Sequence, residues 1–409
     1  MKILWVKAGG LLPLDSGGRI RSYHIIRQLA RSHSLTVFTF YAATESDQNP
    51  ELQSFLHRCI CFPMPLASTR SGATLLRYGS RLLSGQPFAF VRFCRPSVSK
   101  ALRSVALSDN FDVIICDFLL SCGVIPWDIS IPKIIFTHNV EATIWRRHYR
   151  ASANPLWKLV CWREWKSMKR TERLFLERAG KVLTVSDADK DSLSAILDPS
   201  RISTIPTGVD TDYFRSSNLP QLPHSIVFVG SMDWMPNEDG ILFFMERIFP
   251  LVRKTLQCAT IKIVGRDPSA KLIRALQQYS QVTLTGRVDD IRPYLDEAEV
   301  CIVPLRVGSG TRLKIFEAMS MGKAVVTTTL GAEGLPVTDG NNVLVANTEK
   351  DFADAVIRLM QDAGLRSRIG RAARTLVERE YSWRSVGDTF ARSVEDFLAH
   401  DRPLGAAAD

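Results

Sequence analysis

The 409-residue sequence has few of the features that define several common protein classes. Its eight cysteines are scattered, with no C-x-x-C pair and no cysteine/histidine cluster. This excludes a disulfide framework and a structural zinc site, and it predicts free thiols in a reducing cytoplasm. The longest uncharged apolar runs, such as residues 118–127, are far shorter than the ~18–20 residues of a membrane-spanning helix. Lys7 interrupts the apolar start of the chain, which we interpret as a short strand rather than a signal peptide.

Two nucleotide-binding motifs are also missing. The chain contains neither G-x-G-x-x-G nor G-x-x-x-x-G-K-[ST]. Their absence disfavours a nicotinamide-dependent enzyme and a P-loop NTPase.

Acidic residues are missing from one long block. Residues 52–108 contain eight Lys and Arg and no Asp or Glu. Residues 1–205 carry 28 basic and 16 acidic residues, so the net charge of +10 arises in the first half of the chain. Such a block indicates an anionic membrane surface or lipid as a partner, or else a solvated basic face. Leucines at helical spacing in residues 75–83 fit an interfacial helix and a core-facing helix equally well. Nucleic acid is not expected, because no helix-turn-helix, finger or RNP pattern occurs.

What the chain does contain is a repeating alternation of short apolar runs and helical stretches. Strands that are apolar throughout and alternate with amphipathic helices indicate parallel sheets covered on both faces. The fold class is therefore α/β, with two doubly wound, Rossmann-like domains facing each other across a cleft. The break lies in residues 205–225, which are rich in Pro, Ser and Asn, and a long helical stretch is predicted over 141–179. The predicted strands are 2–6, 35–40, 112–116, 133–137, 181–185, 225–230, 261–265, 282–286, 300–304 and 324–328.

The loops after these strands carry the candidate binding residues, because open parallel sheets bind ligands at the carboxyl ends of their strands. Gly17 and Gly18 are predicted to precede a helix that contains Arg19 and Arg21. Asp187 is predicted to cap the helix after residues 181–185. Further candidates at strand ends are Asp117, His138, Asn139, Glu141, Ser186, Gly230, Trp234, Asn237, Gly286 and Arg287.

The segment "VGSGTRLKIFEAMSMGKAVV", residues 307–326, is the strongest local signal. Arg312 and Lys314 stand at the start of a predicted helix, where they oppose the helix dipole. A bound anion would explain them, since glycine, backbone amides and a helix N-terminus form an anion site. Alternatively, Gly308 and Gly310 form a turn and both cations are solvated. Glu317 follows near enough to accept hydrogen bonds from a ribose, so the loops together predict a nucleoside diphosphate in the interdomain cleft.

These motifs resemble the retaining GT-B glycosyltransferases of family 4, the group 1 nucleotide-sugar transferases. The resemblance covers nearly the whole chain and rests on "THNVE", "KVLTVSDADK", "IPTGVDTDYF", "FVGSMDW", "LTGRVDDIRPYL", "VPLRVGSGTRLKIFEAMSMGKAVVTT" and "YSWRSV" in this order. It implies an acceptor domain of residues 1–206 plus a returning C-terminal helix, 382–409. It also implies a donor domain of residues 207–381 that holds the nucleotide sugar.

The resemblance also implies residue roles. Arg312 and Lys314 would neutralise the donor diphosphate, and Glu317 would bind the ribose. His138 would lie beside the transferred sugar as a catalytic residue together with Arg312 and Lys314, and Asn139 and Glu141 are acceptor-side candidates. The other implied donor-site residues are Gly17, Gly18 (at the phosphates or the acceptor), Gly230, Arg287 and Val288 (beside the base), Ser309, Gly310 and Thr311.

The implied mechanism is a retaining transfer in which the leaving diphosphate accepts the acceptor's proton. No metal and no cofactor are expected, because Arg and Lys neutralise the leaving group. An inverting reaction would need a general base, with Asp15, Asp117 and His138 as candidates. Ser309 stands where many relatives carry an acid that holds the sugar, which leaves the sugar open.

The location and pathway follow from the same resemblance. The enzyme is expected in the cytoplasm, peripherally on the inner face of the membrane, with a glycan or lipid-linked acceptor. The alternatives are a non-catalytic nucleotide-sugar-binding protein, or an epimerase or phosphorylase of the same fold.

Overall fold

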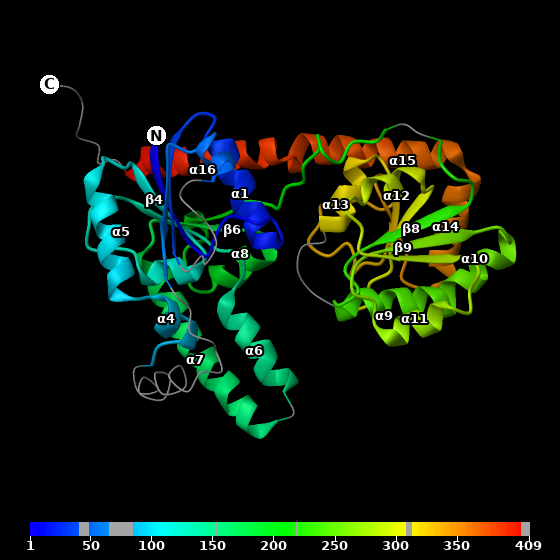
Figure 1. The fold of residues 1–409 in the computed structure, drawn as a ribbon, viewed down its shortest axis with the longest axis horizontal. Helices are drawn as coiled ribbons and strands as arrows, with labels where there is room; N and C mark the ends of the chain where they lie inside the picture. The colour runs from blue at the N-terminus through cyan, green and yellow to red at the C-terminus, as the bar shows by residue number, and fades with distance from the viewer. Residues whose placement is uncertain (41–48, 65–84, 153, 218–219, 308–312, 402–409) are drawn as a thin grey trace. The chain divides into compact units, whose positions relative to one another are not determined.

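The computed structural model describes residues 1–40, 49–64, 85–152, 154–217, 220–307 and 313–401 (Figure 1). The chain divides into two compact units. The first contains Met1–Pro206 and the C-terminal segment from Val386 onward, and the second contains Thr207–Ser385. Helix α16 (Trp383–Asp401) therefore begins in the second unit and continues in the first.

The first unit is built on a seven-stranded parallel sheet with the order β3-β2-β1-β4-β5-β6-β7. The order reverses between β1 and β4, which is where open parallel sheets bind ligands. All five strands predicted for this half are present. The two strands that were not predicted, β3 and β7, form the two edges of the sheet and are partly exposed, so neither is a fully buried apolar strand. The strands are β1 (Lys2–Ala8), β2 (Ser34–Phe40), β3 (Arg58–Phe62), β4 (Val113–Asp117), β5 (Lys133–Phe136), β6 (Lys181–Thr184) and β7 (Ile202–Thr204).

Helices cover both faces of this sheet, as the alternation of side chains along β1 requires. Leu4 and Val6 point into an apolar cluster with residues of the helices on one face. Trp5 points to the other face and packs against Phe390 of α16, with 5.5 Å between ring centroids. The helices of this unit are α1 (Gly17–Leu29), α2 (Pro50–Gln53), α4 (Phe88–Phe93), α5 (Pro96–Ser108), η2 (Leu119–Gly123), α6 (Glu141–Ala151), α7 (Pro155–Arg178), α8 (Asp187–Ser194) and η3 (Pro199–Arg201), together with most of α16.

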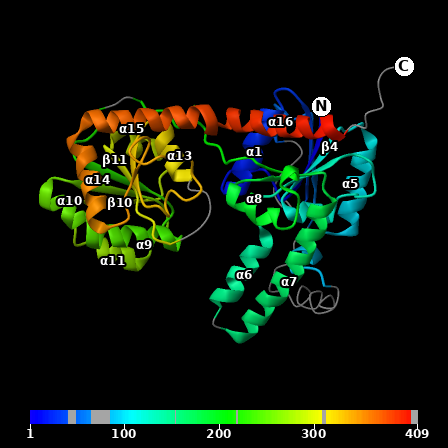
Figure 2. The same cartoon turned by 180° about the vertical axis from the view of Figure 1, so that it is seen from behind.

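The helical stretch predicted over 141–179 is present but broken into two helices, α6 and α7, which form a helical hairpin that projects from the sheet (Figures 1 and 2). Asn154 caps α7, its side chain accepting hydrogen bonds from the backbone N–H groups of Leu156 and Trp157 at 3.0 and 3.1 Å. Pro155 occupies the first helical position, where its missing N–H costs nothing. The same proline disfavours a helical conformation in the preceding residue, so α6 ends before it.

Two predicted helix starts are displaced. Gly17 and Gly18 lie within the first turn of α1 rather than before it, and Ser16 is the N-cap. Ser186, not Asp187, caps α8, because its hydroxyl accepts from the N–H of Asp189 at 3.2 Å. The start of α8 is one residue earlier than predicted because Ser186 and Asp187 are both capping side chains, and the start of α1 is two residues earlier because glycine is typical of a turn before a helix.

The second unit is built on a six-stranded parallel sheet with the order β10-β9-β8-β11-β12-β13. All five predicted strands are present, and only the two-residue β13 was not predicted. The order reverses between β8 and β11, so this unit repeats the arrangement of the first. The strands are β8 (Ser225–Val229), β9 (Thr260–Val264), β10 (Val282–Gly286), β11 (Val300–Val303), β12 (Ala324–Thr327) and β13 (Leu344–Val345).

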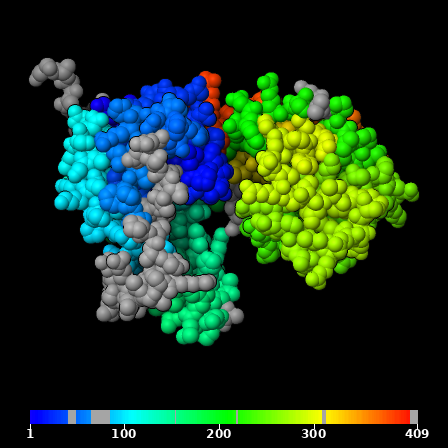
Figure 3. Space-filling model, in the orientation of Figure 1, coloured from blue at the N-terminus to red at the C-terminus, as the bar shows by residue number. Residues whose placement is uncertain are grey.

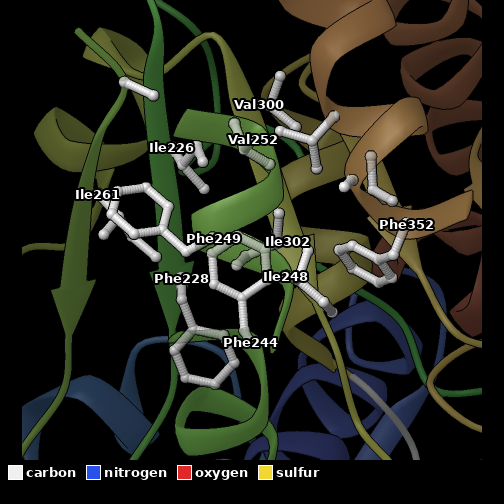
Figure 4. Close-up of a cluster of buried hydrophobic side chains, with 14 of the residues drawn as sticks. Ile226, Phe228, Phe244, Ile248, Phe249, Val252, Ile261, Val300, Ile302 and Phe352 are labelled. Atoms are coloured by element: carbon white, nitrogen blue, oxygen red, sulfur yellow. The ribbon is translucent and has the colours of Figure 1, made fainter. Parts of the chain in front are cut away.

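An aromatic core joins this sheet to its helices. Phe228 of β8 lies beside Phe244 and Phe249, and Phe352 packs on Phe244 with ring centroids 6.0 Å apart (Figure 4). Such burial fixes the sheet edge from which the candidate donor loops emerge. The helices are α9 (Met235–Phe243), η4 (Phe244–Ile248), α10 (Phe249–Thr255), α11 (Ala270–Leu276), α12 (Arg292–Glu297), α13 (Leu313–Ser320), α14 (Glu349–Gln361), α15 (Ala363–Leu376) and η5 (Val377–Tyr381).

Among the helices that the structure describes, none is both long enough and apolar enough to cross a membrane. The eight cysteines are free thiols, as predicted.

Candidate functional site

A buried charge network lies at the strand-order reversal of the first unit. Lys7 of β1 and Asp117 of β4 are register partners on neighbouring strands. The Asp117 carboxylate accepts hydrogen bonds from Lys7 Nζ at 3.2 Å, from Trp5 Nε1 at 3.0 Å and from His138 Nε2 at 2.7 Å. Burial alone would raise the pKa of Asp117, but the Lys7 charge and the contact with His138 hold it well below its usual range. Asp117 is therefore ionised and occupied by protein donors.

His138 is held in one tautomer by this network. Because the Asp117 carboxylate only accepts, Nε2 of His138 carries the proton, and Nδ1 accepts from Arg21 over 2.8 Å. Burial lowers the pKa of His138 to about 4, so the ring is neutral at pH 7. Both ring nitrogens are used, which suits a residue that orients Asp117 and Arg21 better than one that removes a proton.

Phe118 shields the network and explains one of the two predicted glycines. Its φ of 67° is strained for a residue with a side chain, and its ring stacks on His138 with 3.8 Å between centroids. A Cβ atom on Gly18 would lie 2.6 Å from Phe118 Cζ, so packing requires glycine there. A Cβ on Gly17 would meet nothing within 4 Å. Packing therefore does not explain Gly17, whereas the approach of a ligand would.

A mainly apolar pocket of about 200 Å³ lies beside this network. Burial raises the pKa of Glu141, at the start of α6, to about 6. Its carboxyl can thus be protonated or ionised near neutral pH and can exchange hydrogen bonds with hydroxyl groups. The lining residues are Ala8, Ala89, Phe90, Phe118, Leu119, Leu120, Glu141 and Met168.

Two other candidates in this unit lie at the surface. Asn139 is exposed directly after His138. Asp15 is exposed and forms an ion pair with Arg19 at 3.1 Å. The structure does not join either side chain to the buried network through any hydrogen bond among the residues it describes.

In the second unit, a cation lies at the reversal between β8 and β11. Lys314, near the start of α13, donates from Nζ to Asn237 Oδ1 over 2.6 Å and lies 4.5 Å from the Phe228 ring centroid. A Cβ atom on Gly230, directly after β8, would lie 2.5 Å from Lys314 Nζ. Gly230 therefore makes room for the ammonium group. The structure brings together Gly230, Asn237 and Lys314 from segments up to 84 residues apart, all three singled out by the sequence.

Glu317 lies one turn further along α13. Burial raises its pKa to about 7, although the Lys314 charge acts in the opposite direction. Within the described part of the chain, no hydrogen bond reaches this carboxylate. Its two oxygens can therefore accept from a ligand that carries neighbouring hydroxyl groups.

The remaining donor candidates follow β10. Gly286 ends that strand with φ 69°, a conformation that favours glycine. Arg287 is exposed, and Val288 packs partly against the apolar cluster beneath it. Ser309, Gly310, Thr311 and Arg312 lie outside the described residues, as do Gly308 and the predicted helix over 75–83.

No role in a site was predicted from the sequence for Lys7, Trp5 or Phe118. A signal for Lys7 was present, because a lysine inside an otherwise apolar strand must find a partner when buried. Trp5 and Phe118 gave no such signal, since each reads as an ordinary core residue.

Two parallel sheets, each with its own order reversal, define the GT-B class of glycosyltransferase fold. Solved structures share it at low identity, which shows the fold alone. A glycosyltransferase from Rickettsia africae matches with a TM-score of 0.65 and 16% identity, over 97% of this chain and 98% of that one. Anabaena HepE in complex with UDP matches with a TM-score of 0.65 and 14% identity, over 97% of this chain and 100% of that one.

Family models identify the chain more closely. Glycosyltransferase Family 4 matches residues 16–213, and Glycosyl transferases group 1 matches residues 223–362. The chain belongs to the group 1 glycosyltransferases and is a transferase enzyme.

The curated relatives are distant. An uncharacterized 44.6 kDa protein in the cps region of Klebsiella pneumoniae is 22% identical, over 70% of this chain and 74% of its own length. Alpha-D-kanosaminyltransferase of Streptomyces kanamyceticus is 26% identical, over 54% of this chain and 62% of its own length. Phosphatidyl-myo-inositol mannosyltransferase of Mycobacterium tuberculosis is 27% identical, over 47% of this chain and 53% of its own length. The chain thus spans between half and two thirds of the length of the latter two relatives.

Proposed function

We propose that the protein transfers a hexose-type sugar from a UDP- or GDP-sugar to a membrane-associated or polysaccharide-precursor acceptor, with retention of configuration. The observation that carries this proposal is Lys314 beside Gly230 at the β8/β11 reversal. A cation at that point suits the diphosphate of a nucleotide sugar. The UDP complex of Anabaena HepE, a protein of the same fold, supports a nucleoside diphosphate here.

The donor-binding residues have distinct proposed roles. Lys314 and Arg312 neutralise the diphosphate, together with backbone amides near Gly310 and Thr311. Glu317 accepts hydrogen bonds from the ribose. This role is favoured because no donor among the described residues bonds to its carboxylate. The base lies beside Arg287 and Val288. Ser309 contacts the sugar in place of a carboxylate.

Retention needs no base from the protein, since the leaving diphosphate accepts the acceptor's proton. The buried network favours this course. Asp117 already accepts three hydrogen bonds and His138 uses both nitrogens, whereas a general base needs a lone pair directed at the substrate. With Lys and Arg at the leaving group, we expect no requirement for a divalent metal.

The acceptor occupies the first unit in this proposal. Glu141 offers a carboxyl in an apolar pocket, and Gly17 leaves its backbone open to a ligand. A membrane-linked acceptor is consistent with the mycobacterial relative, whose name specifies phosphatidyl-myo-inositol. The basic block 52–108 stays a predicted membrane surface, although one of its cations, Arg103, is paired with Asp128 at 2.7 Å.

Thermal unfolding with a panel of nucleoside diphosphates and nucleotide sugars, without added metal, tests the donor site. A ligand bound only to the folded state raises the melting temperature. We expect a shift with UDP or GDP that is lost in Lys314→Gln and kept in the matched control Lys350→Gln, an exposed lysine of α14. The absence of any nucleotide response would reject the donor assignment.

Turnover distinguishes the remaining alternatives. Binding without transfer to any acceptor would identify a non-catalytic nucleotide-sugar-binding protein. Conversion of the donor sugar in the absence of acceptor would identify an epimerase.

A further inference from the structure

The tip of the α6–α7 hairpin exposes large apolar side chains. Leu156 is 76% exposed, Trp157 50%, Leu159 61% and Trp162 43%, all within the first two turns of α7. A helix that only packs on its own protein shows polar side chains on its outer surface. Four large apolar side chains in so short a segment mark an interaction surface.

These residues are not the packing face of the hairpin. That face is formed by other residues of α7, including the buried Cys161, Ser167 and Met168. Trp165 stacks on Tyr149 of α6 with ring centroids 6.0 Å apart. The exposed tryptophans and leucines at the tip are therefore additional to the contacts that hold the hairpin together.

The charge around the tip has one sign. Residues 142–171 contain eight Lys and Arg and a single acid, Glu164. Glu164 is buried and pairs with Arg163, so it adds no negative charge at the surface. The exposed basic residues include Arg146, Arg150, Lys158, Lys166, Lys169 and Arg170.

We propose that the hairpin tip, Leu156–Trp162, docks on an anionic membrane surface. Tryptophan and leucine enter the boundary between headgroups and acyl chains, while the lysines and arginines meet the anionic headgroups. The hairpin projects clear of the sheet of its unit in both ribbon views, and its outer end forms a protrusion in the space-filling view (Figures 1, 2 and 3).

The same hairpin links this surface to the proposed acceptor pocket. Met168 lines the pocket and lies 12 residues after Leu156 on α7, which is about 18 Å along a helix. The docking proposal rests on the proposed function in one respect, because a membrane-linked acceptor gives the docking its purpose. Docking of the tip would bring the pocket within that distance of the bilayer surface.

Cosedimentation with lipid vesicles tests the docking without donor or acceptor. We expect the protein to pellet with vesicles of phosphatidylcholine and phosphatidylglycerol, to bind phosphatidylcholine vesicles weakly, and to be released by salt. Leu156→Ser with Trp157→Ser should lower the partition coefficient at least about tenfold. Lys166→Gln with Lys169→Gln should lower it about fivefold per lysine.

Matched controls separate this surface from others. Leu107→Ser removes an apolar side chain that is 63% exposed on α5, within the basic block 52–108. Lys254→Gln with Lys271→Gln removes two exposed lysines of the second unit. Both controls should bind vesicles as the unmodified protein does. The tip variant is the protein with Leu156→Ser and Trp157→Ser. Vesicle binding by the tip variant equal to that of the unmodified protein, or loss of vesicle binding in Leu107→Ser instead, would overturn the hairpin proposal.

Two further outcomes are decisive. A concentration-dependent dimer that disappears in the tip variant, with no vesicle binding, would identify the tip as a contact between two copies. The nucleotide-induced thermal shift should persist in the tip variant. Vesicle binding without any nucleotide response would leave the docking surface standing and reject the donor site, so the two failures are distinguishable.

Discussion

His138 Nε2 lies 2.7 Å from Asp117 Oδ1, and the two buried side chains join the ends of β4 and β5 to α1. The contact links the reversal of the first sheet to the helix that carries Gly17 and Gly18. Because both His138 nitrogens and the Asp117 carboxylate are paired, the network is a fixed frame beside the pocket that we propose for the acceptor.

Asp117→Asn should destabilise the protein strongly. It removes the charge that compensates Lys7, whose side chain is 2% exposed. An uncompensated buried charge of this kind typically costs about 3–5 kcal/mol. Urea unfolding measures the change, with Asp128→Asn, in an exposed pair with Arg103, as the control that should change little. Similar effects of the two variants would show that the network contributes no more than a surface ion pair.

His138 should make stability depend on acid pH. Burial lowers its pKa from 6.5 to about 4, so between these values the unfolded chain binds a proton that the folded chain does not. The stabilisation is complete above pH 6.5 and is lost as the pH falls to 4, a change of about 3 kcal/mol.

The difference in unfolding free energy between the unmodified protein and His138→Gln isolates this contribution. It should shrink as the pH falls from 7 to 4. His400→Gln, an exposed histidine of α16, is the control. A constant difference across that window would mean that His138 is not buried as a neutral ring.

Gly17→Ala and Gly18→Ala should act in opposite ways on stability. Nothing lies near a Cβ at Gly17, so alanine there should stabilise the helix by about 0.4–1 kcal/mol. A Cβ at Gly18 meets the Phe118 ring and should cost about 1–3 kcal/mol. If Gly17 admits a ligand, its variant should be more stable yet slower in sugar transfer. A stabilised variant with unchanged transfer would reduce Gly17 to a helix start.

Glu317 should make donor binding depend on pH. Burial raises its pKa to about 7, and only the ionised carboxylate accepts two ribose hydrogen bonds. The dissociation constant of the nucleotide sugar should therefore fall about tenfold as the pH rises from 6 to 8. Isothermal titration calorimetry should show no such change in Glu317→Gln. Parallel pH profiles for the two proteins would contradict the ribose assignment.

The sequence predicted the fold in detail where local signals were strong. All ten predicted strands are present, and all except the partly exposed edge strand β10 are largely buried apolar runs in a parallel sheet. Gly230 and Asn237 were predicted from their place between a strand and the next helix, and Lys314 from its charge at the start of a helix. Their contact could not be predicted, since it depends on how β8 and β11 are paired.

The features that escaped prediction depend on tertiary packing. The hairpin break at Pro155 was missed because the helical pattern continues on both sides of it. The role of His138 could not be read from the chain, since its tautomer is fixed by Asp117 and Arg21 from other elements. The exposure of Trp157 and Trp162 could not be predicted either, because a buried helix has the same pattern of apolar residues.

The course of the chain determines how this enzyme can exchange parts with its relatives. Residues 1–206 and 386–401 belong to the first unit, so the second unit is topologically an insertion between residues 206 and 386. Phe390, downstream of that insertion, packs on Trp5 and Phe136 at 5.5 and 5.3 Å. A chimera with a single junction near residue 206 would join the first unit to the α16 of a relative instead of its own. A cut at both junctions transplants the second unit whole and leaves the first unit's own core intact.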